Sequence, residues 1–260
     1  MPRLSVAIVC RNNERTIGRT LESVRGLADE IVAADSGSTD GTIGLLESAG
    51  ARIIRSEWKG HIATKQMALE ACGGEWVLSL DSDESPTAAL RESIEAALRE
   101  PGGRAGFEVN RKVFYRGRPL NHAWQPEWRL RLVQRGACRW AGLDPHDYLE
   151  PVEAGAQIGR LAGDLRHDSF ETFVEHFNAQ VAHGRTMARS LAATGARGSR
   201  VRLMTSPPTA FLKQLVLKSA WRDGTAGWLA ASSAALGALA KHAALLELTR
   251  TASDEGAGEA

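Results

Sequence analysis

The chain has 260 residues, of which 43% are hydrophobic and 24% charged, and a formal net charge of +1. This composition is ordinary for a soluble globular protein and excludes a disordered, collagen-like or disulfide-stapled chain. The three cysteines, Cys10, Cys72 and Cys138, are too few and too scattered for a disulfide framework or a zinc cluster. We therefore expect neutral, buried thiols in a reducing compartment.

The first hundred residues alternate strand and helix patterns. Short apolar runs with β-branched residues predict strands, and apolar residues at helical spacing predict the helices between them. The predicted strands are Leu4–Cys10, Glu30–Ala34, Arg52–Arg55 and Trp76–Leu80, and the predicted helices are Thr16–Val24, Thr42–Ala49, His61–Cys72 and one capped by Ser85 with Pro86 at its first position. This order predicts βαβ units around a parallel sheet, and therefore an α/β fold.

The pattern changes after the first hundred residues. Alternating apolar residues in Gly106–Leu149 predict antiparallel strands and loops, and an apolar stripe from Phe170 to Val181 predicts a helix packed in the core. The basic segment Gly195–Pro208 is predicted to be a loop. Thr225–Ala240 carries no charge and is too short and too weakly apolar to span a bilayer. It is either a helix in a membrane interface or a helical hairpin packed on the domain.

Basic residues gather in the second half of the chain. Eight Lys or Arg and no Asp or Glu lie between His176 and Arg222, with Lys213 and Lys218 just before the uncharged segment. This balance fits an anionic partner, either phosphates or an acidic lipid surface, as well as a plain solvated face. Aromatic residues are not interleaved with the charges, so we expect no nucleic acid partner. The apolar run at Leu4–Cys10 is too short for a signal peptide, and we expect a cytoplasmic protein, either free or peripheral to the inner membrane.

Two polar turns follow predicted strands. Asp81-Ser82-Asp83 comes directly after a buried strand, and two carboxylates separated by one residue can hold a divalent cation that also bridges a diphosphate. Asp35 begins the turn Asp35–Gly41, which is either a helix cap or part of a nucleoside pocket. Ligands bind beyond the carboxyl ends of parallel strands, so both turns are expected at one edge of the sheet. The glycine motifs of dinucleotide-binding and P-loop proteins are absent from the sequence.

These motifs resemble those of family-2 glycosyltransferases. The segments that carry the resemblance are Leu4–Glu14, Asp35–Thr42 and Leu78–Glu84. More narrowly, Trp124–Arg135, Asp144–Val152, His167–Phe170 and Phe211–Gly227 resemble bacterial lipopolysaccharide core-biosynthesis glycosyltransferases of the β-1,4-glucosyltransferase type. The resemblance implies a GT-A fold, a nucleotide-sugar donor, a divalent metal (Mg²⁺ or Mn²⁺) and inversion at the anomeric carbon.

The resemblance also implies roles for donor-side residues. By position, Asp35 matches an acid that binds the base or ribose, and Lys65 matches a basic residue that faces the donor phosphates. Asp81, with Ser82, matches the acid that faces the sugar and ribose. The two expected metal ligands are Asp83 and His167.

On the acceptor side, Asp147 matches the acid that acts as general base, although the family usually has Glu at this position. Asp144 and Glu150 remain competitors for that role. Trp124 and Arg131 are the expected acceptor-binding residues.

The sequence thus predicts an inverting, metal-dependent glycosyltransferase. The predicted domains are a GT-A domain over 1–168, with a donor half (1–104) and an acceptor half (105–168), a helical region over 169–250 and a disordered tail over 251–260. The expected reaction moves glucose from UDP-glucose onto a lipopolysaccharide-core or other lipid-linked glycan. The alternatives are another nucleotide sugar used on exopolysaccharide or polyprenyl-phosphate acceptors, and a nucleotide-binding module without catalysis.

Overall fold

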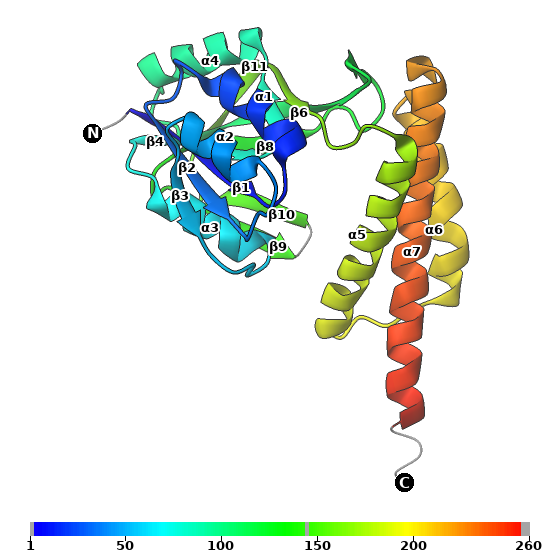
Figure 1. Cartoon of the computed structure of the whole chain (residues 1–260). Helices are drawn as coiled ribbons and strands as arrows, with labels where there is room; N and C mark the ends of the chain where they lie inside the picture. The colour runs from blue at the N-terminus through cyan, green and yellow to red at the C-terminus, as the bar shows by residue number, and fades with distance from the viewer. Residues whose placement is uncertain (1–2, 144–145, 256–260) are drawn as a thin grey trace. The chain divides into compact units, whose positions relative to one another are not determined.

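The computed structural model describes residues 3–143 and 146–255, which form two compact units (Figure 1). The sheet unit contains residues 3–112, 126–142 and 146–168, and the helical unit contains residues 113–125 and 169–255 with Leu143. The sequence placed residues 105–168 in one acceptor half. Residues 113–125 instead belong to the helical unit, because Val113 and Leu120 pack with Phe170 in a separate apolar cluster.

The sheet unit is built on one mixed sheet with the strand order β3-β2-β1-β4-β8-β6-β11-β5. The strands are β1 (Leu4–Cys10), β2 (Glu30–Asp35), β3 (Arg52–Arg55), β4 (Trp76–Asp81), β5 (Glu84–Pro86), β6 (Gly106–Tyr115), β8 (Trp128–Gln134) and β11 (Ile158–His167). Strands β1 to β4 pair in parallel, whereas β8 is antiparallel to both β4 and β6. The predicted strand and helix order, with a parallel first half and an antiparallel second half, is confirmed.

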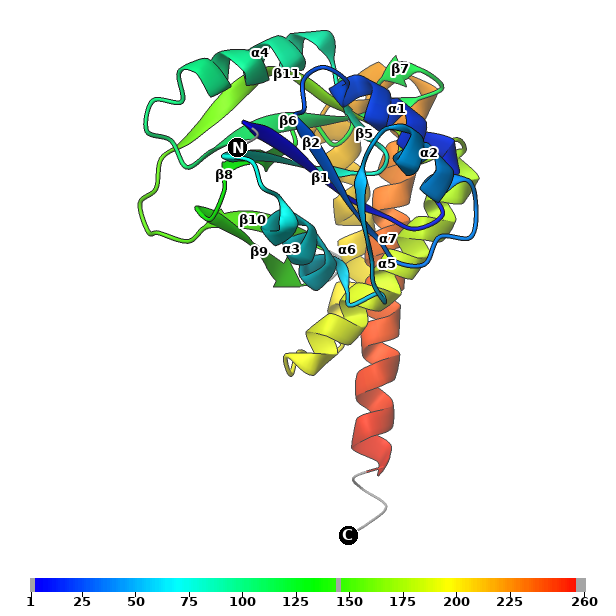
Figure 2. The ribbon, with the colours of Figure 1, turned by 60° about the vertical axis from the view of Figure 1, so that its left-hand side comes forward.

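Both faces of this sheet are covered, which explains why its central parallel strands β1 and β4 are mostly apolar and buried. Helices α1 (Glu14–Val24), α2 (Thr42–Ser48) and α4 (Ala88–Arg99) lie on one face (Figure 2). Helix α3 (His61–Ala71) and the hairpin of β9 (Cys138–Leu143) and β10 (His146–Pro151) lie on the other. Alternate residues of β1 serve the two faces: Val6 and Ile8 face the first set, and Ala7 faces the second.

Register places the two polar turns beside one another. Cys10 at the end of β1 pairs with Asp35 of β2, and Val9 pairs with Asp81 of β4. The two aspartates therefore flank the carboxyl end of β1 on either side. The expectation that both turns share one edge of the sheet is confirmed.

The helix after β4 starts later than the sequence predicted. Ser85 and Pro86 were expected to begin it, but they belong to β5 and pair antiparallel with β11. Helix α4 instead begins at Ala88, and the side chain of Thr87 accepts a hydrogen bond from the backbone of Leu90 as its N-cap. The short strand β5 is a tertiary feature, because its partner lies about eighty residues farther along the chain.

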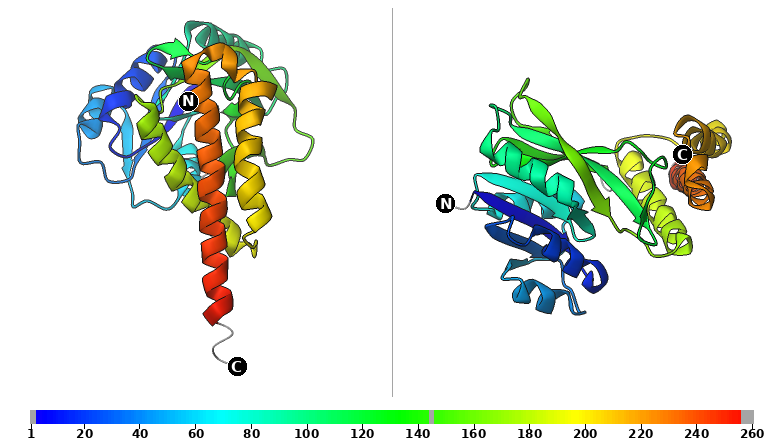
Figure 3. Two further views of the ribbon diagram at one scale, coloured as in Figure 1. Left: turned by 90° about the vertical axis from the view of Figure 1, so that its right-hand side faces the viewer. Right: turned by 90° about the horizontal axis from the view of Figure 1, so that it is seen from above.

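The helical unit consists of three long helices and two short ones. They are α5 (Phe173–Ala193), α6 (Arg200–Leu212), the π-helical turn η1 (Lys213–Leu217), the 3₁₀ turn η2 (Ala220–Asp223) and α7 (Thr225–Glu255). Helix α7 lies between α5 and α6 (Figure 3, left). The unit also holds β7 (Arg118–Pro119), which pairs with the end of β6. As predicted, Phe170 and Phe173 are core residues here, whereas Val174 is exposed.

Three predictions about this unit were wrong: the loop, the start of the tail, and the limited apolar length of the C-terminal segment. The predicted loop Gly195–Pro208 is helical from Arg200 onward, although Pro207 and Pro208 lie inside α6. Ser199 caps the helix, and packing against α7 stabilises it despite the missing backbone donors. Helix α7 also continues to Glu255, into the predicted tail, and its segment Thr225–Thr249 is long and apolar enough to cross a membrane by length and composition alone.

The cysteine prediction is confirmed. All three thiols are free and buried. Burial raises the pKa of Cys10 and of Cys72 to about 12 and that of Cys138 to about 11. These side chains are therefore neutral core groups near neutral pH.

Gly163 allows β11 to pack closely against α4. Its φ is +86°, and an added Cβ would overlap the backbone nitrogen of Leu90. Gly155 has a similar φ of +84°, but its Cβ would meet no atom within 4 Å. We expect Gly155→Ala to lower the free energy of unfolding by about 1–2 kcal/mol and Gly163→Ala by about 3 kcal/mol or more. Urea denaturation would measure both, and equal losses would contradict the close-approach argument.

Candidate active site

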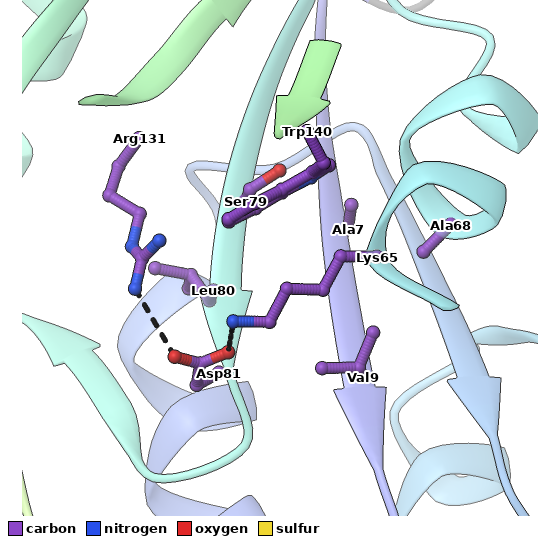
Figure 4. A pocket seen from close by; sticks show the side chains of 9 residues that line it. All are labelled: Ala7, Val9, Lys65, Ala68, Ser79, Leu80, Asp81, Arg131 and Trp140. Carbon is purple, nitrogen blue, oxygen red and sulfur yellow. Dashed lines mark hydrogen bonds and ion pairs between the residues drawn. The ribbon is translucent and has the colours of Figure 1, made fainter. Parts of the chain in front are cut away.

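Asp81, the last residue of β4, lies between two cations (Figure 4). Lys65 Nζ on α3 is 2.7 Å from Asp81 Oδ1, and Arg131 Nη2 on β8 is 3.2 Å from Asp81 Oδ2. Burial opposes ionisation of this carboxyl group, but the charges of Lys65 and Arg131 outweigh it and hold its pKa well below the usual range. Asp81 is therefore a permanent carboxylate at the edge of the sheet.

Glu84 lies beneath this carboxylate and is fully buried. It accepts a hydrogen bond from Arg131 at 2.8 Å and forms a longer ion pair with Arg111 at 3.4 Å. Its other oxygen accepts from the backbone N–H of Asp81 at 3.0 Å, which closes the turn after β4. Arg111 also pairs with Glu127, and despite burial this lowers the pKa of Glu127 to about 2.

These contacts change the expected role of Arg131. Its side chain is only 5% exposed, and its guanidinium is held by Asp81 and Glu84. This geometry does not support direct contact with an acceptor. We instead expect Arg131 to position the carboxylates of the Asp81–Glu84 turn.

Lys65 also links Asp81 to the expected base. Its Nζ is 2.7 Å from Asp147 Oδ2, and the side chains of both residues are 9% exposed. Asp147 lies on β10, where residues three positions apart face opposite sides of the strand. Glu150 accordingly pairs with Arg139 at 2.9 Å, away from Lys65. This favours Asp147 over Glu150 as the base, while Asp144 lies outside the described residues.

A small cavity adjoins the Lys65–Asp81 pair. It is lined by Ala7, Val9, Lys65, Ala68, Ser79, Leu80, Asp81, Arg131 and Trp140 (Figure 4). Lys65 Nζ lies 4.7 Å from the centre of the Trp140 ring, a cation–π distance. Within the described ranges, Ser79 Oγ, Arg131 Nε and Trp140 Nε1 are buried and have no hydrogen-bond partner. The cavity wall therefore has polar groups that can hydrogen-bond to a bound molecule.

Asp83 and His167 are brought together by strand pairing. His167 pairs with Glu84 in the β11–β5 ladder, and its Nε2 is 3.4 Å from Asp83 Oδ2. Burial disfavours the charged imidazole, but Asp83 outweighs this and raises the pKa of His167. His167 Nδ1 is buried without a hydrogen-bond partner in the described part of the chain.

This pair fits the expected metal. A carboxylate and an imidazole suit Mn²⁺ or Mg²⁺ when phosphate oxygens complete the shell. No group of three or more His, Cys, Asp or Glu residues gathers as a ligand set within residues 3–143 and 146–255. A cation held by Asp83 and His167 would therefore need ligands from the bound nucleotide.

Asp35 and Ser82 shape the loops of the site. The Asp35 carboxylate is buried and accepts hydrogen bonds from the backbone of Gly37 at 3.0 Å and of Ser38 at 3.1 Å, as well as from the Ser38 hydroxyl. Ser82 is buried too, and its carbonyl accepts from Thr20 Oγ1 at 3.0 Å. Both residues lie where the sequence predicted, and their donor-binding roles stay predictions.

Trp124 belongs to the helical unit. Its ring centre is 5.3 Å from that of His176, and its backbone N–H donates to Gln214 at 3.3 Å. These contacts are those of a packed residue, and an acceptor-binding role stays a prediction. Sequence reasoning missed three residues of the site, Glu84, Arg111 and Trp140. Glu84 directly follows Asp83 in the sequence, and residues 111–139 are rich in arginine. Together these two features could have indicated that Glu84 is paired with an arginine.

Comparison with known proteins identifies the family. The family model described as glycosyl transferase family 2 matches residues 5–136. The lipopolysaccharide core biosynthesis glycosyltransferase LpsC of Rhizobium meliloti is 31% identical over 243 residues, which is 90% of this chain and 88% of LpsC. An uncharacterized glycosyltransferase of Rickettsia typhi is 26% identical over 238 residues, 88% of this chain and 82% of that protein.

Among solved structures, S. aureus TarS aligns with a TM-score of 0.50 at 15% identity, covering 88% of this chain and 55% of that one. This likeness concerns the fold alone. The chain belongs to glycosyl transferase family 2, and it is a glycosyltransferase with the expected GT-A fold and a C-terminal helical part. The resemblance found in the sequence is confirmed.

The buried ion pairs of Glu84 generate a stability prediction. In Glu84→Gln, Arg111 and Arg131 lose a buried counter-charge, so we expect the free energy of unfolding to fall by about 3 kcal/mol. Glu108→Gln removes a pair with the exposed Arg160 and should cost no more than about 1 kcal/mol. Guanidinium denaturation of both variants would measure the difference. A loss in Glu84→Gln as small as that of the control would contradict the structural role of this cluster.

Proposed function

We propose that this enzyme transfers glucose from UDP-glucose, with inversion, onto a lipopolysaccharide-core or other lipid-linked glycan. One observation carries the proposal: Lys65 lies between Asp81 and Asp147, so that a donor-side carboxylate, a cation and a second carboxylate meet at the edge of the sheet. An inverting transfer is a single in-line displacement, which is assisted by a base at the acceptor hydroxyl and by positive charge near the leaving group. Nothing in it requires a covalent enzyme intermediate.

In the proposed reaction Asp147 is the general base. Its carboxylate accepts the proton of the acceptor hydroxyl as that oxygen attacks the anomeric carbon. Lys65 donates to Asp147 at 2.7 Å and fixes its position. Because Asp147 lies on a strand and is held by a buried partner, it keeps its position during the attack. Such positioning of a catalytic group contributes a large part of the rate enhancement by an enzyme.

The leaving group is a nucleoside diphosphate, whose negative charge grows as the glycosidic bond breaks. Lys65 is the cation placed to stabilise this charge. Asp83 and His167 would hold Mg²⁺ or Mn²⁺, which supplies further charge stabilisation when bound. Arg131 and Glu84 keep the Asp81–Asp83 turn in place around it. The acceptor implies a site of action at the cytoplasmic face of the inner membrane.

The proposed base generates the first functional prediction. We expect Asp147→Asn to reduce kcat by about 10²- to 10⁴-fold, because the amide cannot take the proton. Donor affinity should change little. Glu150→Gln is the matched control and should retain most of the activity. A nucleotide-binding module without catalysis would show no turnover in the unmodified protein either, and an Asp147→Asn variant with full kcat would remove Asp147 from the mechanism.

The metal pair generates a binding prediction. A ligand of the native state raises thermal stability by mass action, by about 2.7 kcal/mol at a hundred times its Kd. We expect UDP-glucose to raise the melting temperature of the protein only with Mn²⁺ or Mg²⁺ present. Asp83→Ala should abolish this metal-dependent rise in a thermal unfolding experiment. Glu95→Ala, an exposed acid on α4, is the control. A shift with GDP-, ADP- or dTDP-sugars instead would reassign the donor, and an unchanged shift in Asp83→Ala would refute the metal assignment.

A further inference from the structure

The turn between α6 and α7 exposes large apolar side chains. Within it Leu212, Val216 and Trp221 are 56%, 57% and 57% exposed, and Leu217 is 79% exposed. Trp228 at the start of α7 is also exposed, and its ring centre lies 6.0 Å from that of Phe211. Residues 211–228, from the end of α6 to the start of α7, are here called the α6–α7 turn. Exposed large side chains grouped in this way mark a binding surface.

Positive charge borders the same surface. Lys213 and Arg222 are exposed within the α6–α7 turn, and Lys218 is partly exposed. In the sequence between Glu175 and Glu247, Asp223 is the one acidic residue, against nine Lys or Arg.

The carboxylate of Asp223 is hydrogen-bonded within the protein. Its carboxylate accepts hydrogen bonds from the backbone N–H groups of Asn121 at 3.1 Å, His122 at 2.9 Å and Ala123 at 2.8 Å. The α6–α7 turn therefore presents apolar side chains and cations to its partner, while its single carboxylate is hydrogen-bonded to backbone donors.

We propose that the α6–α7 turn docks on an anionic lipid surface. Tryptophan is favoured at the level of the lipid headgroups, where its ring is apolar and its N–H remains hydrated. Leu212, Val216 and Leu217 can enter the acyl boundary, while Lys213 and Arg222 meet acidic headgroups. A protein partner with acidic residues around an apolar centre is the competing occupant. Two exposed tryptophans among cations favour the lipid.

In this mode of docking helix α7 does not cross the membrane. Although its composition would allow a span, α7 packs along both α5 and α6. Gly184 of α5 approaches the backbone of Lys241 so closely that a Cβ would lie 2.9 Å from its nitrogen. Helices α5 and α6 carry the exposed Arg185, Arg189 and Arg202, and a spanning α7 would draw these charges into hydrocarbon or break the packing. Docking through the turn leaves the three helices intact.

This inference extends the proposed function, since a lipid-linked acceptor lies in a membrane, but its test is independent of glycosyl transfer. The full chain would be floated with vesicles of phosphatidylethanolamine containing phosphatidylglycerol, and with phosphatidylcholine vesicles. Leu217→Ser with Trp221→Ser removes apolar contact, and Lys213→Glu with Arg222→Glu reverses the charge. Arg189→Glu with Arg197→Glu is the matched control, because it changes the net charge equally on α5 and the α5–α6 loop.

We expect the unmodified chain to float with the anionic vesicles and to be released by high salt. Each turn variant should lower the partition coefficient by about tenfold or more, and the control by much less. Circular dichroism and the metal-dependent nucleotide shift should be unchanged in every variant, which separates this result from failure of the donor site. Equal partition of the turn and control variants would overturn the proposal. So would dimerisation through the α6–α7 turn, detected by light scattering, in a chain that does not float.

Discussion

Glu84 is a buried carboxylate and Asp81 a partly buried one, and the sheet unit is arranged so that each has a positive partner. Moving an ion from water into a protein costs several kcal/mol even after relaxation, so such groups persist only when paired and hydrogen-bonded. The partners come from three elements: Lys65 from α3, Arg111 from β6 and Arg131 from β8. The antiparallel strands beside β4 thus contribute both to the stability of the sheet and to the electrostatics of its edge.

The same ion pairs also hold the proposed reactive groups in fixed positions. Because Lys65 pairs with Asp81 on one side and Asp147 on the other, the proposed donor-side acid and the proposed base share one cation. Groups held in advance of the reaction need little reorganisation as charge develops, which is the main source of electrostatic catalysis. The apolar packing of Trp140 above Lys65 restricts water around that cation.

The sequence predicted those features that depend on local pattern. The strands β1 to β4 and their helices follow from apolar periodicity, and the position of Asp81 and Asp83 follows from the rule that parallel strands end at one edge. The ion pairs of Arg131 with Asp81 and Glu84 could not be predicted, because they depend on β8 lying next to β4, and its acceptor-binding role stays a prediction. Strand β5 and helix α6 were missed for the same kind of reason. One forms only against β11, and the other forms against α7 in spite of Pro207 and Pro208.

The position of β11 in the sheet has a consequence for how this enzyme is made. In sequence β11 is the last strand of the sheet unit, yet in space it lies between β6 and β5. His167 therefore meets Asp83 only after the whole unit has left the ribosome, and contacts of such sequence separation form slowly. Until β11 has been synthesised, Asp83 has no contact with His167. The edges of β6 and β5 that β11 pairs with in the finished sheet remain unpaired during this time. Newly made chains are thus exposed to aggregation through these strand edges until β11 is in place.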